Sequence, residues 1–230
     1  MTSTPLKNKR GPGRPRNIER IDRKKSEILK VSSSLFAENG FKNTDVQEIA
    51  DRLGVAKGTI YHYFQSKEKL FLASVDSGME KLSEFINSSV EDIKDPIKKI
   101  AGAIHYYLVF FDKNPQLIEL IVQERAEFKD RKKPTYMVHR EKNIKPWHEL
   151  FESLTASGRL REVDAETTTL TISNLLYGTI FTTYYSYQGI SFESQTKQIL
   201  SLVFAGILSD KERAKIDEYA SVNLPKHGDK

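Results

Sequence analysis

The sequence has no cysteine in its 230 residues, which excludes disulfides, thiolate zinc sites and cysteine nucleophiles. A chain without cysteine suits a reducing compartment. The basic stretch from Lys7 to Arg16 is followed by more charge, where a secretory signal would have an apolar segment. We therefore expect a cytoplasmic protein.

Charged residues are missing from one stretch of 26 residues, Thr167 to Phe192, which is long enough in principle to cross a bilayer. Its seven threonines and three serines make it a poor membrane segment. A helix that is covered by protein on several sides fits this composition better, so the sequence predicts no membrane partner.

Recognised catalytic signatures are also missing. There is no HExxH motif, Gly-rich phosphate loop or nucleophile elbow, and His105, His139 and His148 have no recognised metal spacing. The sequence therefore predicts no enzyme activity, no metal site and no cofactor.

Basic residues are concentrated in the first part of the sequence. Residues 1–25 contain nine basic and two acidic side chains, a net charge of +7, whereas the whole chain carries +5. One basic end on a nearly neutral body is typical of a protein that meets a polyanion with that end. Residues 1–20 also have almost no apolar side chains, so we predict a disordered basic tail there.

Apolar residues recur at helical spacing beyond this tail, and no segment alternates as a convincing strand. The prediction is an all-α chain of about nine or ten helices, one of them over residues 137–157. Capping residues predict where helices begin: Thr44, Ser66, Asp95, Asp164 and Ser194. Glycines predict where helices end: Gly40, Gly54 and Gly158. The eight charges between Glu124 and Lys133 are interpreted as a solvated helix end and loop.

Two short helices meet at Gly54 with helix-turn-helix spacing, a unit whose second helix shows its outer side to the major groove of DNA. At about 100° per residue, Ile60 and Phe64 of the second helix point inward. The positions that point elsewhere are Gly58, Thr59, Tyr61 and His62. Lys57 stands at the helix start, where the positive end of the helix dipole favours a phosphate. Gly58 costs about 1 kcal/mol of helix stability relative to alanine, which indicates that a partner comes close to the backbone.

Residues 41–71, FKNTDVQEIADRLGVAKGTIYHYFQSKEKLF, resemble the DNA-binding signature of the TetR/AcrR family of bacterial transcriptional regulators. The rest of the chain resembles the family only in being all-helical and of fitting length. The resemblance implies a homodimeric repressor that leaves a palindromic double-stranded DNA operator when a small-molecule effector binds.

The resemblance also implies roles for single residues. Thr44 would cap the first of the two short helices and touch a phosphate, and Lys57 and Lys67 would hold the DNA backbone. Tyr61 and Tyr63 would contact phosphate or sugar, while Thr59 and His62 would face base edges and Gly58 would admit the close approach. The structural alternatives are partly buried rings for the tyrosines, an ordinary first-turn lysine for Lys67 and a plain exposed residue for His62.

The expected domains follow from the helix pattern and the resemblance together. After the tail over residues 1–20, we expect a helix-turn-helix DNA-binding domain over 21–70, an effector-binding and dimerisation domain over 71–220 and a C-terminal tail over 221–230.

The segment from Arg10 to Arg16, RGPGRPR, resembles an AT-hook, in which a Gly-Arg-Pro core lies extended in an A·T-rich minor groove. Arg14 and Arg16 would sense the narrow groove. The alternative is a solvated basic tail that adds only non-specific attraction.

The larger helical part is rich in aromatic residues, and the resemblance implies that it encloses an effector pocket. The expected lining residues are Tyr106, Phe110, Trp147, Tyr177 and Phe181. Plain core packing is the alternative for each. The uncharged helix near residues 167–187 and the helix after 194 are expected at a two-fold dimer interface, where Gly178 and Gly206 would allow close approach.

Two other classes of function stay open. An effector-independent, nucleoid-type DNA binder would use the tail and the helix-turn-helix unit without a pocket. An all-α small-molecule carrier or enzyme would need cofactor or catalytic residues of a kind that the sequence does not display.

Overall fold

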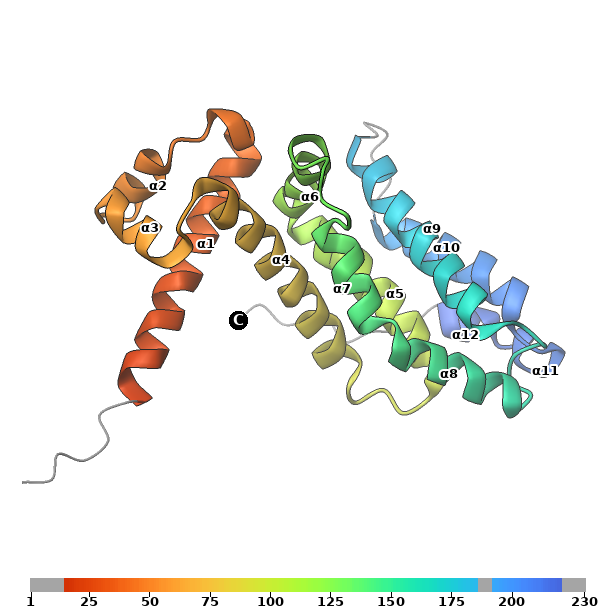
Figure 1. Cartoon of the computed structure of the whole chain (residues 1–230). Coiled ribbons are helices and arrows are strands. Elements are labelled where there is room, and N and C mark those ends of the chain that lie inside the picture. The colour runs from red at the N-terminus through yellow and green to blue at the C-terminus, as the bar shows by residue number, and fades with distance from the viewer. Residues whose placement is uncertain (1–14, 186–191, 221–230) are drawn as a thin grey trace, which may run out of the picture. The chain divides into compact units, whose positions relative to one another are not determined.

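The computed structural model of the chain describes residues 15–185 and 192–220, which are almost entirely helical (Figure 1). The predicted all-α class is confirmed. The helices of the described residues are α1 (Pro15–Asn43), α2 (Val46–Arg52), α3 (Lys57–Phe64), α4 (Lys67–Val90), α5 (Pro96–Lys113), α6 (Pro115–Glu127), α7 (Thr135–Asn143), α8 (Lys145–Ala156), α9 (Ala165–Tyr185), α10 (Phe192–Ile207), α11 (Asp210–Arg213) and α12 (Ile216–Ala220).

The chain divides into two compact units, Met1–Ser74 and Val75–Lys230. This boundary lies four residues after the one expected at 70/71, because it falls inside the long helix α4. No helix among the described residues is both long and apolar enough to cross a membrane.

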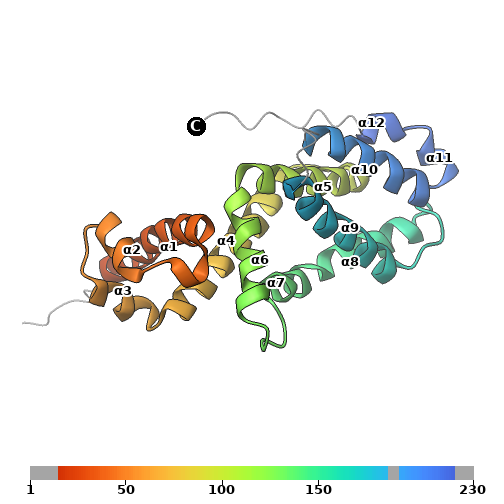
Figure 2. The ribbon, with the colours of Figure 1, turned by 90° about the horizontal axis from the view of Figure 1, so that it is seen from above.

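In the N-terminal unit, α1, α2, α3 and the start of α4 share one apolar core, and Figure 2 shows α1, α2 and α3 grouped together. Fully buried side chains meet there from all four helices: Ile28, Leu35, Phe36, Ile49, Ile60, Leu70 and Phe71. The Phe36 and Phe71 rings pack edge to face with their centroids 5.1 Å apart. Burying each such side chain stabilises the unit by roughly 1.5–3 kcal/mol. Helices as short as α2 and α3 are marginal alone, so this packing holds them.

In the C-terminal unit, α5 packs against α6, α9, α10 and α12. Its apolar side chains at helical spacing are buried: Ile97, Ile100, Ile104, Leu108 and Phe111. Asp95 caps the helix as expected, because its Oδ1 accepts hydrogen bonds from the N–H groups of Ile97 and Lys98 at 2.9 and 3.0 Å. The helix is therefore fixed at its start and along its length.

Several other predicted helix ends are confirmed. Gly40, Gly54 and Gly158 have φ of 81°, 61° and 68°, which a residue with a Cβ adopts only with strain. The Ser66 Oγ accepts from the N–H of Lys69 at 3.1 Å at the start of α4. Asp164 likewise accepts from the N–H of Thr167 at 2.7 Å before α9.

The expected tail over residues 1–20 is wrong in its last six residues, because α1 begins at Pro15. Proline suits the first helical turn, where its missing N–H would have no partner in any case. The segment that follows also has no further proline or glycine before Gly40 to break a helix. Residues 1–14 and the C-terminal tail over 221–230 lie outside the described residues.

The helix expected over 137–157 is two helices, α7 and α8, with Ile144 between them. Pro146 explains the break, since its ring clashes with the preceding turn and it has no N–H to donate. The expected cap at Ser194 is also wrong, because α10 already begins at Phe192. A serine inside a helix cannot act as its N-cap. The prediction used only the residue type of Ser194, and it therefore placed the start of the helix too late.

The charged stretch from Glu124 to Lys133 is not simply a solvated loop, because Glu124 is 1% exposed. Its Oε1 accepts from the N–H and hydroxyl of Thr135, each at 2.9 Å, and from Nη1 of Arg131 at 2.8 Å. A buried carboxylate is tolerated only with such partners. Glu124 therefore fastens the start of α7 to the end of α6.

Candidate nucleic-acid interface and interior cavity

Helix α3 is held by its two inward side chains, as the sequence predicts. Ile60 is fully buried and Phe64 is 8% exposed. The left-handed turn at Gly54 leads the chain from α2 into α3. Tyr61 and His62 are exposed on the outer side. Thr59 and Tyr63 are half-buried, so α3 offers a continuous outer surface of mixed polar and aromatic character.

Lys57, at the start of α3, pairs with Asp45 at the start of α2. The Asp45 Oδ1 accepts from Nζ of Lys57 and from the N–H of Gln47, each at 2.8 Å. The Gln47 N–H and then Lys57 hold the pKa of Asp45 below its ordinary value, while the Asp45 hydrogen bond raises the pKa of Lys57. Lys57 is thus a fully charged cation, and it is positioned where two helix N-termini meet.

Thr44 does not have the expected capping role. Asp45 is the N-cap of α2, and Thr44 is 1% exposed. The Thr44 hydroxyl lies 2.8 Å from the carbonyl of Gly40 and 3.1 Å from that of Leu35, so it is used inside the unit. Burial removes this side chain from contact with a phosphate, and its role is to fix the corner between α1 and α2.

Lys67 is half-buried at the first turn of α4. Its Nζ donates to the carbonyl of Lys42 at 2.9 Å and lies 4.9 Å from the centre of the Phe41 ring. Because an ammonium has three donors, one carbonyl does not exhaust it. Lys67 therefore combines a structural contact with a cation that can still reach a partner.

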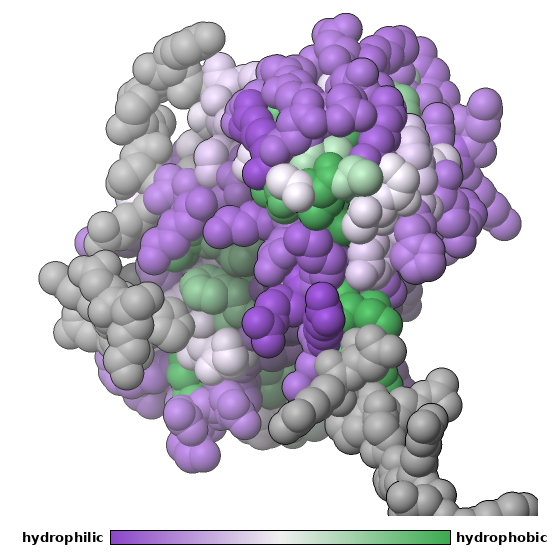
Figure 3. All heavy atoms as spheres, turned by 90° about the vertical axis from the view of Figure 1, so that its left-hand side faces the viewer, coloured by the Kyte–Doolittle hydropathy of each residue, from purple (hydrophilic) through white to green (hydrophobic). Residues whose placement is uncertain are grey.

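Gly58 is exposed, and a Cβ added to it would meet no atom within 4 Å. The protein's own packing therefore does not require glycine here, which agrees with the predicted close approach of a partner. Figure 3 shows the molecule from the side on which α2 and α3 lie in Figure 1, and that surface is mostly hydrophilic. A hydrophilic face suits a polar partner better than an apolar one.

The structure describes only Pro15 and Arg16 of the segment that resembles an AT-hook. Arg14 lies outside the described residues. Pro15 and Arg16 are helical, so they do not have the extended backbone that an AT-hook core requires. Both residues are helical because α1 begins at Pro15.

Residues 28–74, which contain α2, α3 and the contacts just described, match the model of a family described as "Bacterial regulatory proteins, tetR family". These residues therefore form a TetR-family domain. A solved regulator of the TetR/AcrR family from Thermobifida fusca is 26% identical, with a TM-score of 0.62, and the match covers 80% of this chain and 98% of that one.

Curated relatives extend the similarity. The transcriptional repressor KstR2 of Mycolicibacterium smegmatis is 23% identical over 80% of this chain and 90% of its own. The transcriptional activator FasR of the same organism is 28% identical over 50% of this chain and 51% of its own, so this match spans about half of that relative. Both an activator and a repressor therefore occur among the similar proteins.

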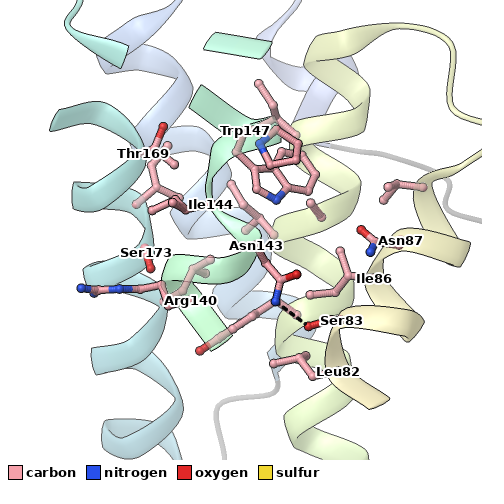
Figure 4. Close-up of a pocket in the computed structure, with 18 of the residues that line it drawn as sticks. Leu82, Ser83, Ile86, Asn87, Arg140, Asn143, Ile144, Trp147, Thr169 and Ser173 are labelled. Carbon is pink, nitrogen blue, oxygen red and sulfur yellow. Dashed lines mark hydrogen bonds between the residues drawn. The ribbon is translucent and has the colours of Figure 1, made fainter. Parts of the chain in front are cut away.

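The C-terminal unit contains a cavity of about 790 Å³. Its walls come from α4, α5, α7, α8 and α9 (Figure 4). Most lining side chains are apolar, among them Leu82, Ile86, Ile104, Trp147, Leu150 and Leu176. Pockets of roughly 300–1,000 Å³ with few polar groups are typical sites for small organic molecules.

Of the five aromatic residues expected to line a pocket, only Trp147 lies in the cavity wall. Tyr106 and Phe110 pack instead on Phe85 of α4, with ring centroids 5.7 Å away in each case. Tyr177 packs between Tyr136 and Phe181, at 4.5 and 4.7 Å. On α5 the expectation was wrong by one residue, about 100° of helix rotation, since Tyr107 is the residue that lines the cavity.

Polar groups in the cavity wall join α7 to α4. His139 is 5% exposed, and its Nε2 lies 2.7 Å from Oδ1 of Asp76. Asn143, one turn later, donates from Nδ2 to Oγ of Ser83 at 3.0 Å, the contact dashed in Figure 4. The same face of α7 therefore touches the cavity and holds α4 by two hydrogen bonds.

A second polar group in the wall contains Arg140 and two tyrosines. The hydroxyls of Tyr107 and Tyr136 lie 2.9 Å apart, and burial raises the pKa of Tyr136 to about 12 and that of Tyr107 well above its ordinary value. Arg140 donates from Nη1 to Oδ1 of Asn174 on α9 at 2.9 Å.

These polar lining residues were not predicted from the sequence. One signal was present, because His139 and Asn143 are four residues apart and share a helix face.

Helices α9 and α10 have exposed outer faces with few charges, Glu166 on α9 and Lys197 on α10. Most of the exposed residues of α9 follow one uncharged helical stripe: Thr167, Thr171, Asn174, Gly178, Thr182 and Tyr185. On α10, Leu202 is 71% exposed, and a Cβ at Gly206 or at Gly178 would meet nothing within 4 Å. Thr183 and Gln195 tie the two helices together at 2.6 Å. A face with these properties is typical of a helix that packs against another protein surface.

Proposed function

We propose that the chain is a homodimeric transcriptional regulator that binds palindromic double-stranded DNA through α3 and releases it when a small molecule fills the cavity. The observation that carries the proposal is the outer surface of α3. Burial of Ile60 and Phe64 leaves Tyr61 and His62 pointing outward within the stretch that matches the TetR family. A short helix held in this way fits a major groove.

The proposed DNA contacts divide into two kinds. Lys57, Lys67, Tyr61 and Tyr63 contact phosphate and sugar, which sets the register of α3 on the duplex. Thr59 and His62 face base edges, where sequence is distinguished. Gly58 lets the α3 backbone approach the DNA without a side chain between them.

The second copy is proposed to pack on α9 and α10. Leu202 supplies exposed apolar area, and Gly178 and Gly206 leave room for another helix to approach. A two-fold dimer places two copies of α3 about 34 Å apart, one turn of DNA, so it predicts an operator with two related half-sites.

The proposed release depends on α4, which begins in the N-terminal unit and continues into the C-terminal unit. In the C-terminal unit it forms one wall of the cavity and is held by α7 through His139 and Asn143. A ligand that favours one arrangement of α7 over another shifts α4 with it, and the two copies of α3 then fit the operator less well.

Selection of bound duplexes from a random pool tests this proposal. We expect an enriched palindrome with half-sites about one helical turn apart. A dimer that makes about eight phosphate contacts should also show a log-log salt slope near −7. A pool without enrichment contradicts sequence-specific DNA binding, and an enriched single half-site contradicts the dimer.

A further inference from the structure

We infer that the cavity takes a monocarboxylate with an apolar body, whose carboxylate binds at Arg140 and whose body lies against Trp147 and the aliphatic walls. This inference rests on the proposed function, because such a ligand regulates DNA binding only if the cavity is the effector site. Its chemical claim concerns only what fills the cavity.

The charge of the cavity wall favours an anion. Its lining includes the cations Lys99, Arg140 and Lys142 and a single carboxylate, Glu91. Among the described residues, no carboxylate forms an ion pair with Arg140; its one hydrogen bond goes to the neutral amide oxygen of Asn174. A guanidinium keeps its charge in a protein, so this part of the wall is positive and has no counter-ion.

Arg140 also has an unused donor. Its Nε is buried and has no acceptor among the described residues. A buried N–H without a partner is costly, and one next to a positive charge attracts a negatively charged acceptor most strongly. A carboxylate oxygen supplies the missing countercharge, and it becomes the acceptor for Nε when the side chain shifts to expose that atom.

The two buried tyrosines add a further donor near Arg140. Between the hydroxyls of Tyr107 and Tyr136 one proton is shared in their mutual hydrogen bond, and the Tyr136 hydroxyl also interacts with Ser173, another lining residue, so the three hydroxyls form a polar group that can donate to a ligand. Burial keeps both hydroxyls protonated at neutral pH, while the Arg140 charge acts in the opposite direction on the pKa of each. The Arg140 charge therefore acts at both hydroxyls.

The rest of the wall selects an apolar body. Ile86, Ile144 and Trp147 also line the cavity; the two isoleucines offer no hydrogen bonds, and Trp147 offers only its indole N–H. A cationic head would face Arg140, Lys99 and Lys142 with like charge, so the wall favours an anion over a cation. A single carboxylate on a hydrocarbon or aromatic body fits both parts of the wall.

Trp147 provides the readout, since it is the only tryptophan of the chain and lies in the cavity wall. The full-length protein is titrated with three acids and the primary amide of each: decanoic, 4-phenylbutanoic and lithocholic acid. The amides keep the body and remove the charge. We expect a change of Trp147 fluorescence, with at least one acid binding about tenfold or more tightly than its amide.

The Arg140→Gln variant should remove this preference for acid over amide, while Arg140→Lys, which keeps the charge, should retain part of it. Arg161→Gln, an exposed arginine of the same unit, is the matched control and should behave as the unchanged protein. Circular dichroism shows whether each variant is folded, and the lysine variant keeps the test valid if the glutamine variant is not. The inference is wrong if no acid binds more tightly than its amide, or if Arg140→Gln keeps the preference.

Operator binding, measured on the same preparations, separates this inference from the proposed function. Acid binding that leaves operator affinity unchanged supports the ligand class and contradicts the effector role. Operator binding by a protein that shows no acid preference contradicts the ligand class and leaves the DNA-binding proposal standing.

Discussion

His139 Nε2 lies 2.7 Å from Asp76 Oδ1, and this contact joins the cavity-lining helix α7 to α4. His139 is buried in the cavity wall, whereas the Asp76 side chain is 54% exposed. Asp76 is also only two residues beyond Ser74, where the N-terminal unit ends. Within the C-terminal unit, a change in the cavity would therefore reach α4 through this pair, at a point close to the unit boundary.

Replacing Asp76 by alanine should weaken the link between cavity and operator. The buried imidazole loses its partner, so we expect a loss of about 1–2 kcal/mol in the free energy of unfolding. We also expect the effector to change operator affinity less than in the unchanged protein. Urea denaturation and fluorescence anisotropy with labelled operator measure the two effects. The control is Asp130→Ala, an exposed loop carboxylate. Full effector response in Asp76→Ala would show that this contact carries no coupling.

A charge at Leu202 should prevent dimerisation. This side chain is 71% exposed on α10, and a buried glutamate without a partner in the proposed interface would be costly. We expect Leu202→Glu to be monomeric at micromolar concentration by light scattering and to bind single half-sites only. Val138→Glu changes another exposed aliphatic residue, 44% exposed on α7, and should stay dimeric. A Leu202→Glu dimer would place the interface elsewhere.

Glu124→Ala should destabilise the C-terminal unit by about 3 kcal/mol, because it leaves Arg131 and the N–H of Thr135 without their shared acceptor. Chemical denaturation measures the change. Glu152→Ala removes an exposed carboxylate and should cost almost nothing. If the two variants are equally stable, the buried ion pair is not important for stability.

Much of the fold could be predicted from the sequence because local signals agreed with one another. The inward positions of α3, the caps at Asp95 and Asp164 and the left-handed glycines follow from periodicity and turn chemistry alone. These features depend on neighbours within a few residues.

The cavity could not be predicted in the same detail. Whether Tyr106 or Tyr107 lines it depends on how α5 is rotated against α4, which is a matter of tertiary packing. The burial of Glu124 within a highly charged stretch likewise depends on Thr135, eleven residues later. Composition alone favours solvent for such a stretch.

Glu212 should make stability depend on pH. The hydrogen bond from Arg159 Nε, at 2.7 Å, is the main reason that the pKa of Glu212 falls from its ordinary 4.5 to about 2, and Tyr219 also donates to this carboxylate. A lowered pKa stabilises the folded state above the ordinary value, and this contribution is lost as the pH falls from about 5 towards 2.

We therefore expect Glu212→Gln to be less stable at pH 7, by an amount on the order of 2 kcal/mol, and to lose less stability than the unchanged protein on acidification. Urea midpoints at pH 7, 5, 4 and 3 check this. Glu162→Gln, an exposed carboxylate, should follow the curve of the unchanged protein. Parallel curves for Glu212→Gln and the unchanged protein would contradict the assignment.

The central claim is that the outer surface of α3 contacts the DNA. The most direct test is to measure how tightly the Lys57→Ala, Tyr61→Ala double variant binds the selected operator. Each side chain is expected to contribute about 1–3 kcal/mol, so the account predicts a loss of roughly 100-fold in anisotropy titrations, with circular dichroism unchanged. Lys129→Ala, a cation exposed in a loop of the other unit, should bind as before. Undiminished operator binding by the folded double variant would contradict the account.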